Sequence, residues 1–146
     1  MKAQTKAYGE IEIDDRQRIL FPRGLLGFEK FKEYALMDAP QKPFFYLQSL
    51  ELPELAFVLI DPFLFRSDYS IDINDRDLAQ IELSNPEEAL VFSIVTVPGD
   101  GQAVTANLMG PLVVNKKNRL AVQTVLSDPR WFVKHDIMAE MAKGGS

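Results

Sequence analysis

The chain has 146 residues, 47% of them hydrophobic, enough for one domain with a sizeable core. It contains no cysteine and a single histidine, His135, which excludes disulfides and thiolate chemistry and nearly excludes a histidine-based metal site. The formal net charge is −5, and no basic cluster is larger than Lys116, Lys117 and Arg119. Direct binding of nucleic-acid phosphates is therefore disfavoured, and a basic protein is the more natural partner.

The cellular location and the extent of the domain can also be predicted. No run approaches the roughly 20 apolar residues that span a bilayer, and residues 1–14 lack the apolar centre of a signal peptide. We therefore expect a cytoplasmic protein with no membrane contact. A single domain is predicted over residues 1–138. Residues 139–146 are expected to be a frayed tail, and the terminal Gly-Gly-Ser resembles a cloning remnant.

Extended segments dominate the first half of the chain. Residues 1–13 predict a pair of strands with Gly9 at the bend between them. Apolar runs bounded by turn residues predict further strands at 19–21, 34–37, 44–50 and 56–60. Between the first two of these, residues 21–31 carry a proline and two glycines that argue against a helix. We expect a structured loop there, whose Leu25, Leu26 and Phe28 close one end of the core.

Residues 72–88 form an acidic section in which Arg76 is the single basic residue. Its carboxylates are Asp72, Asp75, Asp77, Glu82, Glu87 and Glu88. Asp75 is predicted to cap a short helix, and Asn85 a second one with Pro86 at its first position. The section can be a solvated face, a partner-binding face, or a metal or catalytic site. A calcium-binding loop is disfavoured because the spacing does not match and the central glycine is missing.

A buried strand over residues 90–97 precedes the stretch 104–123, which predicts a β-hairpin. Pairing Val114 with Leu120 leaves residues 115–119 as the loop. In this register four apolar residues share one buried face: Leu112, Val114, Leu120 and Val122. The Gly110-Pro111 step predicts a bulge, a bend or a sheet edge within the first arm.

Two amides in the hairpin, Asn107 and Gln123, are expected to satisfy backbone groups near Pro111, with partner contact as the alternative. After the hairpin, residues 131–138 fit both a strand and a helix, and we favour a strand. Eight or more short strands with only one or two helical turns predict an all-β protein, an antiparallel barrel-like single domain.

Catalytic chemistry is not supported by the sequence. The one histidine is expected to be a partly exposed structural residue, and residues 24–27 lack the lysine and following helix of a phosphate-binding loop. We therefore predict no enzyme, no cofactor and no metal. The ten phenylalanines leave a β-barrel that binds a small apolar ligand as an alternative, and a hydrolase that uses the acidic section is a weaker one.

Four segments carry a resemblance to a known family. They are FPRGLLGFE at 21–29, FVLIDPF at 57–63, ANLMGPLVVN at 106–115 and RLAVQ at 119–123. In this order they resemble the FliW family of bacterial flagellar assembly factors, over residues 1 to about 137. The family usually has alanine at the position of Gly110, and residues 131–137 match only loosely.

The resemblance implies a mostly β, barrel-like fold and a cytoplasmic partner switch that is not an enzyme. Members of the family bind flagellin and, separately, CsrA, the RNA-binding repressor of flagellin translation, on which they act allosterically. The acidic section (Asp72, Asp75, Asp77, Glu82, Glu87 and Glu88) is then the expected surface for basic CsrA. Leu25, Phe63 and Phe65 are candidate contacts for flagellin, with core packing as their alternative. A monomer is expected when no partner is bound.

Overall fold

The computed structural model describes residues 1–144 and confirms the mostly β class. The strands are β1 (Lys2–Thr5), β2 (Gly9–Glu12), β3 (Arg18–Leu20), β4 (Glu33–Asp38), β5 (Phe45–Ser49), β6 (Ala56–Ile60), β7 (Ala89–Thr96), β8 (Thr105–Ala106), β9 (Leu112–Asn115), β10 (Ala121–Gln123) and β11 (His135–Asp136). The helices are α1 (Asp75–Gln80) and α2 (Ile137–Gly144), with 3-10 turns η1 (Asp15–Gln17), η2 (Pro62–Leu64) and η3 (Pro86–Glu88).

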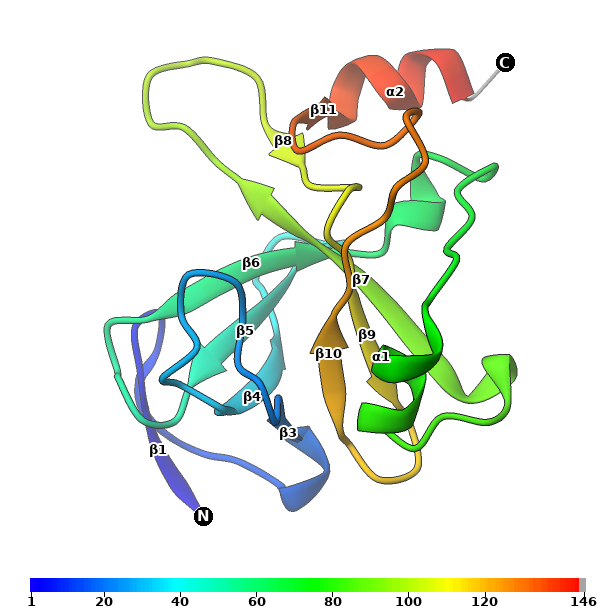
Figure 1. The fold of residues 1–146 in the computed structure, drawn as a ribbon. Helices are drawn as coiled ribbons and strands as arrows, with labels where there is room; N and C mark the ends of the chain where they lie inside the picture. The colour runs from blue at the N-terminus through cyan, green and yellow to red at the C-terminus, as the bar shows by residue number, and fades with distance from the viewer. Residues whose placement is uncertain (145–146) are drawn as a thin grey trace.

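The main sheet runs in the order β10-β9-β7-β6-β5-β4-β3, with every neighbouring pair antiparallel (Figure 1). Its two end strands approach each other at a single bridge between Leu20 and Leu120, where the Leu20 N–H donates to the Arg119 carbonyl at 3.0 Å. The path is therefore barrel-like but is not closed by a full ladder of hydrogen bonds.

Strand β7 connects the two halves of the structure. Residues 89–92 pair with β9, 93–95 pair with β6, and 95–96 pair with β8. Its side chains alternate between two cores, so that Phe92 belongs to one cluster and Val95 to the other. In Figure 1, the β9–β10 hairpin and α1 lie toward one end of β7, while β8, β11 and α2 lie toward the other.

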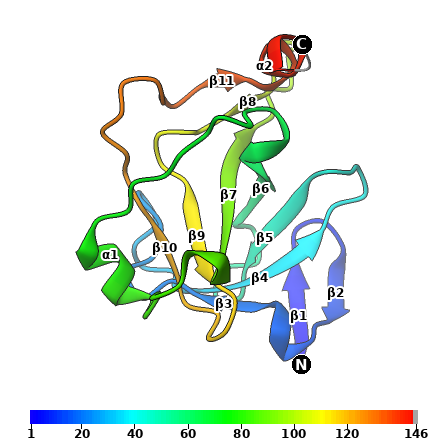
Figure 2. The ribbon, with the colours of Figure 1, turned by 90° about the vertical axis from the view of Figure 1, so that its right-hand side faces the viewer.

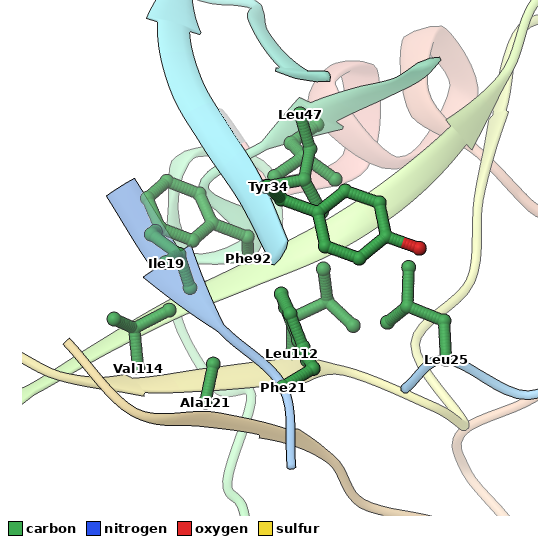
Figure 3. Close-up of a cluster of buried hydrophobic side chains, with 10 residues drawn as sticks. Ile19, Phe21, Leu25, Tyr34, Leu47, Phe92, Leu112, Val114 and Ala121 are labelled. Atoms are coloured by element: carbon green, nitrogen blue, oxygen red, sulfur yellow. The ribbon is translucent and has the colours of Figure 1, made fainter. Parts of the chain in front are cut away.

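The interior of the strand path is filled by side chains. Phe21, Tyr34, Leu47, Phe92 and Leu112 come from different strands and their loops and are buried together (Figure 3). The Phe21 and Tyr34 rings pack edge to face with centroids 5.4 Å apart. This packing occupies the space that a small ligand inside the barrel would need.

The N-terminal strands form the predicted pair, with Gly9 at a φ of +68° beside the turn.

The loop over residues 21–31 agrees only in part with the prediction. Leu25 is buried at 1% exposure, but Leu26 and Phe28 are exposed. One apolar side chain of this loop therefore closes the core, and the prediction that all three are buried is wrong.

The predicted hairpin is present, but its register differs by one residue. Val114 pairs with Ala121, and the Asn115 N–H donates to the Leu120 carbonyl, which leaves Lys116–Arg119 as the loop. The apolar residues therefore divide between two faces. Leu112 and Val114 belong to the cluster of Phe21 and Tyr34, while Val113 and Val122 pack with Ile81, and Leu120 is only partly buried. The prediction of one shared face is wrong, because β9 is buried on both sides.

The expectations around Pro111 are confirmed. Residues 107–111 form a bend between β8 and β9 rather than part of either strand. The Asn107 Oδ1 accepts from the N–H groups of Met109 and Gly110, and the Gln123 Nε2 donates to the Gly110 carbonyl at 3.0 Å. Both amides thus satisfy backbone groups that the bend removes from the sheet.

The C-terminal end is more ordered than the sequence suggested. Only His135 and Asp136 form a strand, and Ile137–Gly144 form helix α2 in place of the expected frayed end. Ile137 at the start of this helix is buried against Trp131 and Tyr69, which anchors it to the body of the protein. Gly145 and Ser146, from the suspected remnant, lie outside the described residues.

Candidate partner-binding surface

The acidic section folds into α1, η3 and the short connections around them. Asn74 caps α1, with its side chain accepting from the Asp77 N–H, so the cap lies one residue before the predicted Asp75. The second prediction is confirmed, because Asn85 caps η3 and Pro86 occupies its first position. Helix α1 packs against β10, as both ribbon views show (Figures 1 and 2).

Asp77 is a structural anchor within this section. Its side chain is buried, pairs with Arg23 from the 21–31 loop, and accepts from the Thr124 hydroxyl at 2.8 Å. The Asn74 amide donates to the same carboxylate at 3.1 Å. Three segments distant in the chain therefore meet at Asp77, and no local pattern predicts these contacts.

Four of the six carboxylates are free to meet a partner at the surface. Asp72, Asp75, Glu82 and Glu87 are exposed. Glu88 is half-buried and forms an ion pair with Lys117 at 3.1 Å. Lys116 of the same loop lies close by, since its N–H donates to the Glu88 carbonyl at 2.8 Å. The exposed acids thus form a negative surface with a small basic edge.

The three apolar candidates lie in different environments. Leu25 and Phe65 are 1% and 2% exposed and contribute to two separate cores, which is the packing role held as their alternative. Phe63 lies in η2 and is 43% exposed, beside exposed Leu64. Of the three side chains, only Phe63 is available for direct contact. The structure brings it into a hollow with Asp72, so the acidic and apolar candidates meet there.

A polar network near the C-terminus joins residues for which the sequence predicts no contact. His135 is 1% exposed, so the prediction that it is partly exposed is wrong. Its ring stacks on the Phe132 ring, with centroids 3.7 Å apart, and its Nδ1 contacts the Glu140 carboxylate. Arg66 pairs with both Asp68 and Glu140, and the Arg66 hydrogen bond lowers the pKa of Asp68 to about 2. The guanidinium groups of Arg66 and Arg130 lie 4.7 and 4.8 Å from the centre of the Trp131 ring.

Within residues 1–144, no three His, Cys, Asp or Glu side chains come together as a metal site. No helix in this part of the chain has the length and apolar character needed to cross a membrane.

Comparison with known proteins gives a consistent result. The family described as FliW protein matches residues 2–137. A flagellar assembly factor FliW from Treponema pallidum (strain Nichols) is 54% identical over 98% of this chain and 95% of its own length. A protein of the same description from Treponema denticola is 52% identical over 99% of both chains. A crystal structure of the flagellar assembly factor FliW superposes with a TM-score of 0.86 at 35% identity, over 94% of this chain and 96% of its own.

Proposed function

Because the chain belongs to the FliW family of flagellar assembly factors, we propose that it binds flagellin and, separately, the translational repressor CsrA. In this proposal, flagellin that accumulates occupies the protein and leaves CsrA free to repress flagellin translation. Export of flagellin frees the protein, which then binds CsrA and relieves the repression. The protein acts as a cytoplasmic regulator rather than as an enzyme, and is a monomer between its complexes.

The observation that carries the CsrA part is the exposed acidic surface of Asp72, Asp75, Glu82 and Glu87. CsrA binds RNA and is expected to be basic, so a negative surface favours docking on it at a site apart from its RNA contacts and repels RNA itself. Asp77 anchors α1, because its bonds to Arg23 and Thr124 hold this helix against β10. Of the four exposed acids, Asp75 lies in α1, so this anchoring reduces the entropy lost when its carboxylate is ordered on binding.

Titration of the protein with purified CsrA and, in a separate experiment, with flagellin tests the proposal. We expect binding to both, and we expect a ternary complex of the protein, CsrA and RNA to be detectable transiently, because the proposed action is allosteric. Absence of binding to either protein at micromolar concentration would contradict it.

Charge reversal tests the acidic surface itself. The double variant Asp72→Lys, Asp75→Lys is expected to slow association with CsrA by about tenfold at low salt, with a smaller effect at high salt. Glu54→Lys is the matched control, because Glu54 is exposed and lies outside the acidic section. If both variants associate at the wild-type rate, the acidic surface is not the CsrA site.

A further inference from the structure

Half of strand β7 has an uncovered edge. Strand β6 pairs with β7 from Val58–Val95 to Ile60–Ser93, and the chain then turns away into η2. Residues 89–92 of β7 pair with β9 on their other side and, within residues 1–144, have no strand on the side of β6. Figure 2 shows β9 alongside the lower half of β7, whereas β6 meets only its upper part.

The register determines which backbone groups face this edge. The carbonyls of Glu88 and Ile94 accept from Lys116 and Asn107, so the even-numbered residues direct their backbone toward β9 and β8. In an antiparallel ladder these directions alternate along the strand. The N–H and C=O of Val91, and the C=O of Ala89, therefore point to the uncovered edge. The Ala89 N–H is already bound to the Pro86 carbonyl.

Open edges are normally blocked by charge, by proline or by a covering segment, since they can pair with other chains. Residues 89–92, Ala-Leu-Val-Phe, carry no charge and no proline. Within residues 1–144 the segment next to them is η2, which contacts β7 but forms no ladder with it. Instead, an apolar hollow lies on either side of the edge. One of about 620 Å³ is lined by Phe44, Phe45, Leu90 and Phe92.

The second hollow, of about 420 Å³, is lined by Ile71, Ile73, Leu78 and Leu83. Phe63, Ala89 and Val91 line both hollows, so the edge of β7 separates one from the other. A strand directs successive side chains to opposite faces. A strand added at this edge would therefore place alternate side chains in the two hollows.

We propose that the edge of β7 at residues 89–92 is a docking site for an extended segment of a partner protein, which adds a strand to the main sheet. Both hollows are apolar, so the segment carries a short continuous run of apolar residues rather than an alternating pattern. Asp38, Asp61 and Asp72 line the hollows against a single basic residue, Lys42. This charge balance favours basic residues on both sides of the apolar run.

This inference deepens the proposed function, on which it rests for the identity of the protein that supplies the segment. The recognition chemistry itself is independent of that identity, because it depends on backbone pairing and two apolar hollows. It can therefore be tested with a synthetic segment.

The probe is the capped, fluorescently labelled peptide Lys-Ser-Val-Ile-Val-Leu-Ser-Lys, followed by fluorescence anisotropy. We expect saturable binding, and we expect methylation of the two central peptide nitrogens to weaken it about tenfold or more, because one of these N–H groups faces β7 in either register. Hydrogen exchange of the Val91 amide, measured by NMR, should slow when the unmethylated peptide is bound.

Phe63→Asp is expected to weaken peptide binding about tenfold or more, since it places a charge between the two hollows. Phe63 is already 43% exposed, so the fold should tolerate the change. Val97→Asp is the matched control, because Val97 is 60% exposed and lies beyond the far end of β7. Binding of this control should equal that of the wild type.

Three results would overturn the inference: no binding at millimolar peptide, equal binding of the methylated peptide, or unchanged exchange of the Val91 amide. If the peptide fails while CsrA and flagellin still bind, the docking site is refuted and the proposed function remains. If the peptide binds as expected while neither protein does, the proposed function fails and the docking site remains.

Discussion

The Nδ1 nitrogen of His135 lies 2.6 Å from Oε1 of Glu140, and this contact holds helix α2 against the rest of the protein. The Phe132 N–H donates to Nε2 of the same ring at 3.0 Å. Nε2 is therefore the unprotonated nitrogen, and Nδ1 donates its hydrogen to Glu140. Arg66 donates to both oxygens of the same carboxylate at 3.3 Å. Glu140 thus connects β11, α2 and the segment after η2.

Removal of this carboxylate should loosen the C-terminal end. We expect Glu140→Ala to lower the free energy of unfolding by about 2 kcal/mol, because the buried His135 N–H loses its acceptor and Arg66 keeps only its pair with Asp68. Glu140→Gln should cost about half as much, since its carbonyl can still accept from His135. Urea denaturation provides the measurement. Glu54→Ala, at an exposed site, should change stability by less than about 0.5 kcal/mol. An equal change in the free energy of unfolding for Glu140→Ala and Glu54→Ala would show that Glu140 does not anchor α2.

Two glycines in the 21–31 loop form a matched pair. Gly24 has a φ of +67°, and a Cβ atom there would lie 2.7 Å from the Glu29 Cα. Gly27 has a φ of +87° with open space around it. Gly27→Ala should therefore cost about 1 kcal/mol for its backbone conformation alone, and Gly24→Ala at least about 2 kcal/mol more. Similar melting temperatures for the two variants would contradict this.

The buried hydroxyl of Tyr34 should reduce stability. It has no hydrogen-bond partner among the described residues, although the ring is fully buried in the core (Figure 3). Tyr34→Phe is therefore expected to leave stability unchanged or raise it by about 1 kcal/mol. Tyr69→Phe is the contrasting variant, because the Tyr69 hydroxyl donates to the Leu108 carbonyl at 2.6 Å and its loss should cost about 1 kcal/mol. Loss of stability in both variants would contradict the prediction for Tyr34.

Tyr34 should also make stability depend on pH in the alkaline range. Burial, with a smaller contribution from Glu51, raises the pKa of Tyr34 to about 12. An unfolded tyrosine titrates near pH 10, so the unfolded state releases this proton first. The titration of Tyr34 therefore leaves the free energy of unfolding unchanged below about pH 10. Between pH 10 and 12 it lowers this free energy, because only the unfolded state has released the proton. Urea denaturation between these values should show a shallower loss of stability for Tyr34→Phe than for the wild type. Equal slopes would show that Tyr34 is not the group responsible.

The amide of Gln123 connects the 21–31 loop to the bend before β9. Its Oε1 accepts from the Leu26 N–H at 2.9 Å, and its Nε2 donates to the Gly110 carbonyl. We expect Gln123→Ala to destabilise the protein by about 1–2 kcal/mol and to accelerate hydrogen exchange at the Leu26 amide. Gln102→Ala, in the exposed turn before β8, should do neither. Unchanged exchange at Leu26 in the first variant would contradict the bridging role.

Local patterns predicted those parts of the fold that local forces determine. Gly9 marks the bend between β1 and β2, and Asn85 with Pro86 marks the start of η3, because both depend on the conformations open to a few adjacent residues. The strand at Ala56–Ile60 follows equally from its short apolar run. The resemblance to the FliW family came from the order of such segments along the chain.

Contacts between distant segments decided the rest. The hairpin register could not be read from apolar alternation, because β9 is buried on both faces and a shift of one residue still buries apolar side chains. Leu25 and Phe63 are equally apolar, but only Leu25 lies where β9 and β4 leave room for it in the core. The uncovered edge of β7 exists because β6 ends at Ile60. The sequence by itself determined most of the strands and, through the order of their motifs, the family to which the chain belongs. Only the tertiary structure decided which faces, edges and charges remain available to a partner, because burial depends on neighbours far away in the chain.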